Sequence, residues 1–245
     1  MIEEANNAIQ WIKKYVENAG AKGVVIGNSG GKDSATVLAM AVKALGKEKV
    51  VAVSMPCYSK KADFEDAKLV ANKFGVEHIT VDLSSCYKKM EDEIQKNIQL
   101  SKEATINIKP RLRMTTLYGI AQTMDYLVIG TGNLCESMVG YTTKWGDSAY
   151  DFNPIGNFTV EEVLEIGKYL GVPEKILKKA PSDGLGDQTD EEKMGITYKQ
   201  ITQMIETGNT EEQAKRKILD MFQKSKHKRE PAPIYKFKRK NLLNK

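Results

Sequence analysis

Short runs of β-branched and other apolar residues alternate with helical patterns along the first half of the chain. The apolar runs cover residues 22–29, 49–56, 76–82 and 125–132. The helical patterns cover residues 34–46, 61–74 and about 84–124, the last interrupted near Lys109-Pro110. Continuously apolar strands that alternate with helices predict an α/β fold, with a parallel β-sheet flanked by helices on both faces. Ligands of such a sheet bind beyond the carboxyl ends of its strands, so a site is expected in the turns after residues 28, 55, 82 and 130.

The second part of the chain predicts a helical C-terminal extension of the same domain. Helices are expected over 159–170 and 210–224, and a loop rich in turn-forming residues over 180–190. From residue 222 onward nine Lys or Arg residues stand against one Glu, and Pro231 and Pro233 prevent a continuous helix. We therefore expect a single domain over residues 1–245, with a basic tail over about 222–245.

Composition excludes several classes of protein. Hydrophobic residues make up 41% of the 245, which is enough for a buried core and excludes extensive disorder. No apolar run approaches the roughly 18 to 20 residues that a membrane span needs, and the acidic, amphipathic N-terminus is not a signal peptide. The net charge of +5 is too small for an obligatory nucleic-acid binder. The three cysteines form no CxxC pair, which argues against a disulfide framework and favours a reduced, cytoplasmic protein.

A glycine-rich segment joins the first predicted strand to its helix, and it consists of Gly27, Asn28, Ser29, Gly30, Gly31, Lys32, Asp33 and Ser34. Glycines let the backbone curl so that several N–H groups point at one anion, and the start of the helix adds partial positive charge. Ser29 and Ser34 can donate hydrogen bonds to phosphate oxygens, and Asp33 can hold a magnesium ion. Asp33 stands where a Walker A loop needs Ser or Thr, so this is a phosphate-binding loop of another kind.

Further polar residues follow the later elements. Arg111 and Arg113 are expected near a helix start and could bind carboxylate or phosphate, although taken alone they are more typical of a solvated helix face. Thr131, after the fourth predicted strand, can bond a nucleotide. Glu136 can complete a magnesium site with Asp33, because hard cations prefer carboxylate and phosphate oxygens.

A polar segment then supplies one cation and two acceptors, Lys144, Asp147 and Asp151. This set suits a dinucleotide, which carries ribose hydroxyls and a diphosphate. Any one of these residues fits an ordinary polar surface loop equally well, but the whole string together favours a binding site.

These motifs resemble known families. SGGKDS (29–34) is similar to the pyrophosphate loop of the ATP pyrophosphatases, which cleave ATP to AMP and pyrophosphate. Together the motifs closely resemble those of the ammonia-dependent NAD synthetases, and the resemblance runs from about residue 8 to residue 234. Its further motifs are NIKPRLRM (107–114), GTGNLCESMVGYTTKWGD (130–147), DFNPIGN (151–157), KAPSDGLGDQTDEEKMGITY (179–198) and HKREPAP (227–233).

The resemblance implies a Rossmann-like fold of the adenine nucleotide α hydrolase type, a homodimer, and an activity. That activity is the ATP-dependent amidation of deamido-NAD by ammonia to NAD, through an adenylated intermediate, with release of AMP and pyrophosphate. ATP would be bound by Gly27 to Ser34, Thr131 and Ser182. Magnesium (Mg²⁺) would be held by Asp33 and Glu136. Deamido-NAD would be held by Arg111, Lys144, Asp147, Asp151, His227 and Lys228.

The sequence departs from this family at two places. The family usually carries a phosphate-binding lysine at the position of Val160, and valine cannot do this. Lys32, at a loop position that varies in the family, is a candidate for partial compensation. The segment 182–188 is shorter than usual and lacks an aromatic residue, and this loop normally covers the reacting centre, so both departures affect lid closure and turnover.

The length of the chain indicates where the nitrogen of the new amide comes from. A glutamine-using synthetase needs an amidase domain with a Cys nucleophile, and no such domain fits here. The cysteines Cys57, Cys86 and Cys135 are better interpreted as small hydrophobic residues. We therefore expect free ammonia as the substrate, and a separate amidase partner stays open.

Two other functions remain open from the sequence. The first is a tRNA-modifying adenylating enzyme of the same superfamily, which the basic tail supports through nonspecific attraction to phosphate. Against it, catalytic paired cysteines and an appended RNA-binding domain are absent, so no nucleic-acid partner is expected. The second is a weakened sensor of ATP or a dinucleotide, supported by Val160 and the short 182–188 segment.

Overall fold

The computed structural model describes residues 1–179 and 189–237 of the chain. Its sheet has four parallel strands in the order β3-β2-β1-β4. They are β1 (Gly23–Gly27), β2 (Val50–Ser54), β3 (Glu77–Thr80) and β4 (Tyr126–Ile129). In the central strand Val24 pairs with Val50 of β2 on one side and with Leu127 of β4 on the other. The predicted parallel sheet is confirmed.

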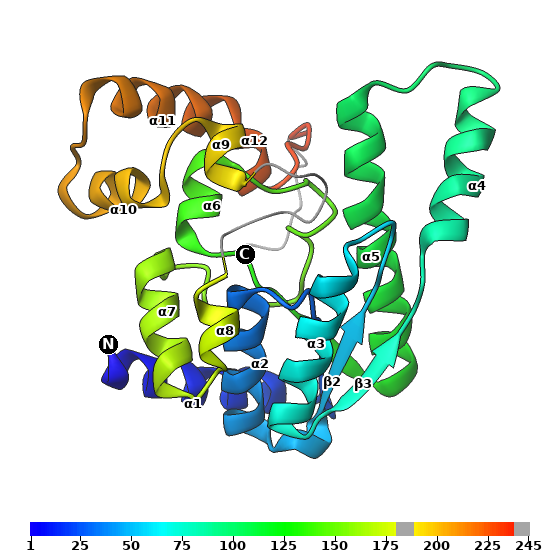
Figure 1. Ribbon diagram of the computed structural model, residues 1–245, viewed down its shortest axis with the longest axis vertical. Helices are drawn as coiled ribbons and strands as arrows, with labels where there is room; N and C mark the ends of the chain where they lie inside the picture. Colours follow the sequence, from blue (N-terminus) through cyan, green and yellow to red (C-terminus); the bar gives the residue numbers. More distant parts are fainter. Residues whose placement is uncertain (180–188, 238–245) are drawn as a thin grey trace.

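Helices connect and cover these strands (Figure 1). Within the described residues they are α1 (Ile2–Asn18), α2 (Lys32–Leu45), α3 (Lys61–Phe74), α4 (Ser84–Gln95), α5 (Lys102–Met124), α6 (Leu134–Val139), α7 (Val160–Tyr169), α8 (Glu174–Leu177), α9 (Asp190–Met194), α10 (Tyr198–Thr207), α11 (Glu212–Lys224) and α12 (Lys226–Arg229), with a 3₁₀ turn at Lys47–Lys49.

Strands β1 and β2 are buried on both faces of the sheet, which is why they are continuously apolar in sequence, whereas the edge strand β3 is partly exposed. On one face Val24 packs in a cluster with side chains of α1, α2 and α7, among them Leu38 and Ile166. On the other face Val25 packs in a cluster with side chains of α4 and α5, among them Leu117. Complete burial of one such aliphatic side chain stabilises the fold by roughly 1.5 to 3 kcal/mol, so these two clusters hold the layers together.

A third apolar cluster forms above the carboxyl ends of the strands, where Figure 1 shows α6 and α9 near each other. It unites side chains of α6, α7, α9, α10 and α11, with Ile201 and Ile218 fully buried in it. Val160 at the start of α7 belongs to this cluster, whereas Ile166 in the same helix belongs to the sheet core. Helix α7 therefore ties the C-terminal helices to the sheet.

The break in the long helical stretch lies elsewhere than predicted. Pro110 is inside α5, and the interruption falls at residues 96–101 instead. Ser101 caps the second helix, because its side chain accepts a hydrogen bond from the Ala104 amide at 3.2 Å. Pro110 removes only the bond that its own amide would have made to the carbonyl of Ile106, and the helix continues past it. Arg111 and Arg113 consequently lie in the middle of α5, not near a helix start as predicted.

The C-terminal part contains more helix than the sequence predicted. The expected helices 159–170 and 210–224 correspond to α7 and α11, but α8, α9, α10 and α12 were not predicted. The basic tail forms the short helix α12 and then, up to residue 237, has no regular secondary structure, as its two prolines led us to expect. Among residues 1–179 and 189–237, no helix combines the length and apolar character that crossing a membrane requires.

Candidate active site

The glycine-rich loop runs between the end of β1 at Gly27 and the start of α2 at Lys32. Gly30 has a φ of +74°, and Gly31 is the residue that precedes α2. The Ser29 and Ser34 hydroxyls lie 3.0 Å apart, and Ser34 Oγ donates to the Gly31 carbonyl at 3.1 Å. The loop therefore has the left-handed turn and the helix start that an anion-binding loop needs.

Asn28, which the sequence placed among the ATP-binding residues, has its side chain turned into the protein. It is buried, and its Nδ2 donates to the carbonyl of Ala67 in α3 at 2.8 Å. Its backbone amide donates to Val53 of β2 at 2.8 Å. The Asn28 side chain thus fixes the loop against α3 and its backbone amide fixes it against β2, while Ser29 and Ser34 remain at the start of α2.

Two carboxylates meet beside this loop. Asp33 lies in the first turn of α2, and Glu136 lies in α6, which follows β4. Asn133 joins them, because its Nδ2 donates to Asp33 Oδ1 at 3.3 Å and its backbone amide donates to Glu136 Oε2 at 2.9 Å. The sequence did not single out Asn133. Thr131 lies two residues beyond the end of β4 and two residues before Asn133 in the chain.

Lys32 is the cation of this carboxylate pair. Its Nζ lies 3.0 Å from Asp33 Oδ2. Burial lowers the pKa of Lys32, but the negative charges of Asp33 and Glu136 outweigh burial, and the pKa is raised overall. Burial, together with the charge of Asp33, raises the pKa of Glu136 well above its usual range. A raised pKa means that the surrounding positive charge does not fully stabilise the ionised Glu136 carboxylate. A further cation beside it would therefore be favourable.

The residues of this site can be compared with the ligands that magnesium usually has in proteins. Magnesium is usually bound by one or two protein carboxylates plus water and substrate phosphates, so Asp33 and Glu136 beside a phosphate loop are a fitting pair. The described residues contain no group of three or more His, Cys, Asp or Glu side chains that could hold a metal alone. The site therefore suits a metal that arrives with its phosphate ligand.

Replacing Glu136 with glutamine should stabilise the ligand-free protein at pH 8. Glutamine can still accept the Asn133 amide, so the helix cap of α6 is kept. The folded-state pKa of Glu136 is raised above the unfolded value of 4.5, so the destabilisation is absent below that value and grows as pH rises above it. We expect the gain to be at least about 1 kcal/mol larger at pH 8 than at pH 5, measured by urea unfolding.

The control for that variant is Glu162→Gln. Glu162 has the same capping role in α7, where its Oε2 accepts the amide of Thr159 at 2.8 Å. A gain for Glu136→Gln that is equal at pH 5 and pH 8, or equal to that of the control, would contradict the assignment.

The basic residues predicted for the acceptor lie together where α12 meets the loop after α6. Lys228 Nζ donates to the carbonyls of Gly140 and Thr142 at 2.7 and 2.6 Å. Lys144 Nζ donates to the His227 carbonyl at 2.6 Å, and Arg111 Nε donates to the Lys144 carbonyl at 3.3 Å.

Three cationic groups are therefore held close together by backbone carbonyls. Burial and the charge of Arg111 lower the pKa of Lys228, against the opposing effect of Asp147. Such a cluster can bind a phosphate or carboxylate, because an ammonium or guanidinium has further donors to offer beyond those already used.

The two acidic residues predicted for the acceptor have partners in the protein. Asp147 Oδ1 accepts the Thr143 amide at 2.6 Å. Asp151 Oδ2 accepts the amide of Val128 in β4 at 2.7 Å, and its Oδ1 accepts from the Tyr118 hydroxyl at 3.2 Å. Asp151 therefore accepts a hydrogen bond from a backbone amide of the edge strand β4. Its position in the sequence did not indicate this structural role.

The sequence departs from the NAD synthetase pattern at Val160 and in the segment 182–188, and the structure describes only the first of these. Val160 is 5% exposed inside the third apolar cluster and is no phosphate ligand. Ser182 and the segment 182–188 lie outside the described residues. Just before them, Lys179 is held to α3 by ion pairs with Asp63 and Asp66, at 2.7 and 2.8 Å.

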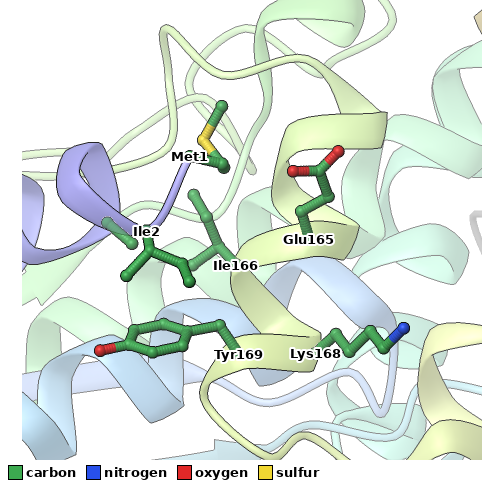
Figure 2. Close-up of a pocket in the computed structure, with 7 residues that line it drawn as sticks. Met1, Ile2, Glu165, Ile166, Lys168 and Tyr169 are labelled. Atoms are coloured by element: carbon green, nitrogen blue, oxygen red, sulfur yellow. The ribbon is translucent and has the colours of Figure 1, made fainter.

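A hollow of about 420 Å³ lies elsewhere, between the start of α1 and α7 (Figure 2). Apolar side chains dominate its lining, among them Met1, Ile2 and Ile166. None of the residues predicted to bind ATP, magnesium or the acceptor contributes to it. It is therefore separate from the loop at the end of β1.

Comparisons with known proteins identify the family of this chain. A family model described as NAD synthase matches residues 4–232. The chain is 44% identical over 230 residues to the curated NH(3)-dependent NAD(+) synthetase of Carboxydothermus hydrogenoformans, a match that covers 93% of this chain and 94% of that protein.

Two solved structures are similar over 96% of this chain and 98% of their own. The first is an NMN synthetase from Francisella tularensis, with a TM-score of 0.91 and 38% sequence identity. The second is an NH3-dependent NAD synthetase from Campylobacter jejuni subsp. jejuni, with a TM-score of 0.79 and 29% identity.

Proposed function

This chain belongs to the NAD synthase family, and we propose that the site at the end of β1 carries out the ammonia-dependent reaction of its relatives. The enzyme is an ammonia-dependent NAD synthetase, an ATP-dependent ligase that forms a C–N bond. Its acceptor is deamido-NAD, whose nicotinate carboxylate becomes the amide of NAD. The observation that carries the proposal is the phosphate loop with Asp33 and Glu136 beside it.

The chemistry explains why ATP is needed. A carboxylate resists attack by ammonia, because its negative charge makes the carbon a poor electrophile. When a carboxylate oxygen attacks the α-phosphorus of ATP, pyrophosphate leaves and the acid becomes an acyl adenylate. Ammonia then attacks the carbonyl carbon, loses a proton and displaces AMP. The first step depends mainly on positioning and on neutralising charge around the phosphates.

The loop supplies both. Its backbone amides and the start of α2 would face the phosphates, and Ser29 and Ser34 would supply hydroxyl donors. Asp33 and Glu136 would hold magnesium, which when bound neutralises phosphate charge. Thr131 and Ser182 complete the proposed ATP site.

The proposed acceptor site is the basic cluster of Arg111, Lys144 and Lys228, with His227, Asp147 and Asp151 beside it. Replacing Arg111 with methionine should raise the KM for deamido-NAD by about 10-fold, because one charged hydrogen-bond donor is lost. The KM for ATP should change little. The measurement is the initial rate of NAD formation with each substrate varied in turn.

Arg216→Met is a matched control, because Arg216 is an exposed residue of α11 that pairs with Glu212 at 2.8 Å. An unchanged KM for deamido-NAD in Arg111→Met would remove Arg111 from the acceptor site.

One experiment tests the function as a whole. The purified chain is incubated with ATP, Mg²⁺ and deamido-NAD, with and without ammonium, and products are followed by mass spectrometry. We expect NAD, AMP and pyrophosphate in equal amounts, with NAD only when ammonium is present. Binding of both substrates without AMP formation would instead support the sensor interpretation. The family assignment argues against the tRNA-modifying alternative.

A second acceptor is favoured by one observation. The solved relative named NMN synthetase has both a higher TM-score and a higher identity than the NAD synthetase from Campylobacter jejuni. Nicotinate mononucleotide carries the same carboxylate as deamido-NAD and would undergo the same two steps. A competition assay with both acceptors at equal concentration distinguishes them, and we expect NAD as the main product because the 44% identical relative is named for NAD.

We also propose a cytoplasmic homodimer. Trp11, Tyr15 and Phe152 form an aromatic group with ring centroids 4.6 to 5.7 Å apart, and Trp11 is 43% exposed in the single chain. Tyr15 also donates to the backbone carbonyl of Asp151, a residue of the proposed acceptor site, at 3.0 Å. Light scattering of the purified protein measures the oligomeric state directly.

A further inference from the structure

Lys32 stands out among the cations of the described chain, because it is the one basic side chain that is buried. It is 7% exposed, whereas most lysines of this protein extend into solvent. Its ammonium donates a hydrogen bond to Asp33 Oδ2 at 3.0 Å and lies 5.6 Å from the ring centroid of Tyr198. A buried ammonium is costly unless it is paired, so this pairing is a built feature of the site.

The partner of Lys32 is also the proposed magnesium ligand. Asp33 cannot keep the ammonium at hydrogen-bond distance and also bind a divalent cation there without strong repulsion between the two positive charges. A metal beside Asp33 would therefore leave Lys32 buried without its hydrogen-bond partner, although the charges of Glu136 and Asp190 remain near it. The anion that enters the site with the metal is the phosphate chain, and Lys32 is part of the loop that would bind it.

We propose that Lys32 is an exchangeable counter-ion of this site, which pairs with Asp33 in the nucleotide-free enzyme and with the phosphate chain when magnesium binds beside Asp33. The inference rests on the proposed function, and it adds a binding order to it. Without nucleotide, Lys32 competes with the metal for Asp33. With nucleotide, the ammonium has a new partner and the metal position becomes available, so metal and phosphate bind cooperatively.

Two binding measurements on Lys32→Met test this, and they should change in opposite directions. Manganese alone, followed by the loss of its free EPR signal, should bind at least about 5-fold more tightly than to the wild type. Pyrophosphate in the presence of magnesium, followed by calorimetry, should bind at least about 10-fold more weakly. A general loss of structure would weaken both.

The matched control is Lys43→Met, which makes the same change in the same helix, where Lys43 lies over the Tyr169 ring. It should leave both affinities unchanged. Lys32→Arg keeps the charge and should retain most of the pyrophosphate affinity, which keeps the test valid if the methionine variant does not fold.

Manganese affinity that does not rise in Lys32→Met, or pyrophosphate affinity that does not fall, would overturn the inference. If the wild type itself binds no magnesium pyrophosphate, the proposed function fails first. The two failures are therefore distinguishable.

Discussion

Asp33→Asn is expected to reduce pyrophosphate release by about 1000-fold or more, with little change in the fold. The substitution keeps the size of the side chain and its place in the first turn of α2. It removes one of two carboxylates available to magnesium and leaves Lys32 without its ion-pair partner. Because adenylation depends on neutralising phosphate charge, the loss should appear mainly in kcat. The measurement is a coupled assay of pyrophosphate release, with circular dichroism to monitor the fold.

Asp125→Asn is the control for that variant. Asp125 is the exposed residue that follows the end of α5, has a φ of 58°, and pairs with Lys22 on the surface. Asparagine tolerates this backbone conformation, so the control should retain nearly full activity. If Asp33→Asn keeps more than about a tenth of wild-type turnover, the magnesium site must be assigned to other residues.

Much of the sheet layer was predictable from sequence, because local and tertiary preferences agree there. The predicted helix over 61–74 coincides with α3, and each predicted strand contains the observed one. Burial on both faces requires continuous apolar runs, and such runs are visible without knowledge of the fold. The phosphate loop was predictable for the same reason, since a strand, a turn and a helix are contiguous there.

Two of the helices that were not predicted, α9 and α10, carry a signal in the sequence. Thr189 with Glu192 and Thr197 with Gln200 are both capping boxes, and they mark the starts of α9 and α10. Both helices are short, with five and ten residues, so hydrophobic periodicity alone does not distinguish them from loops. The prediction of a helix break at Pro110 was wrong because proline disfavours a helix interior locally, whereas the packing of α5 on both sides of Pro110 outweighs that preference.

Contacts over long sequence distances explain what could not be predicted in the site. Asn133 touches Asp33 across 100 residues. Lys32 is buried in part because Tyr198, from the C-terminal helices, covers it. Asp151 is used by the edge of β4, a consequence of the bridge between Ile129 and Phe152. None of these pairings leaves a local pattern, so they follow only from the assembled fold.

Gly30→Ala is expected to lower the stability of the protein by about 3 kcal/mol and to abolish nucleotide binding. Two effects combine at this position. The φ of +74° is unfavourable for a residue with a Cβ. An added Cβ would also lie 2.4 Å from the Asp63 carbonyl oxygen and 2.8 Å from the Ala67 amide nitrogen. Both atoms are backbone of α3, so no side-chain rotation relieves the overlap, and the loop or the helix must move.

Gly208→Ala separates these two effects. Gly208 has a φ of +71°, but an added Cβ there meets no atom within 4 Å. This variant therefore carries the backbone strain alone and should lose about 1 kcal/mol. The measurements are urea unfolding of both variants and calorimetric binding of pyrophosphate in the presence of magnesium. Equal destabilisation of the two variants would show that the close contact with α3 does not fix the loop. The expected difference of about 2 kcal/mol would instead show that the phosphate loop depends on its contact with α3.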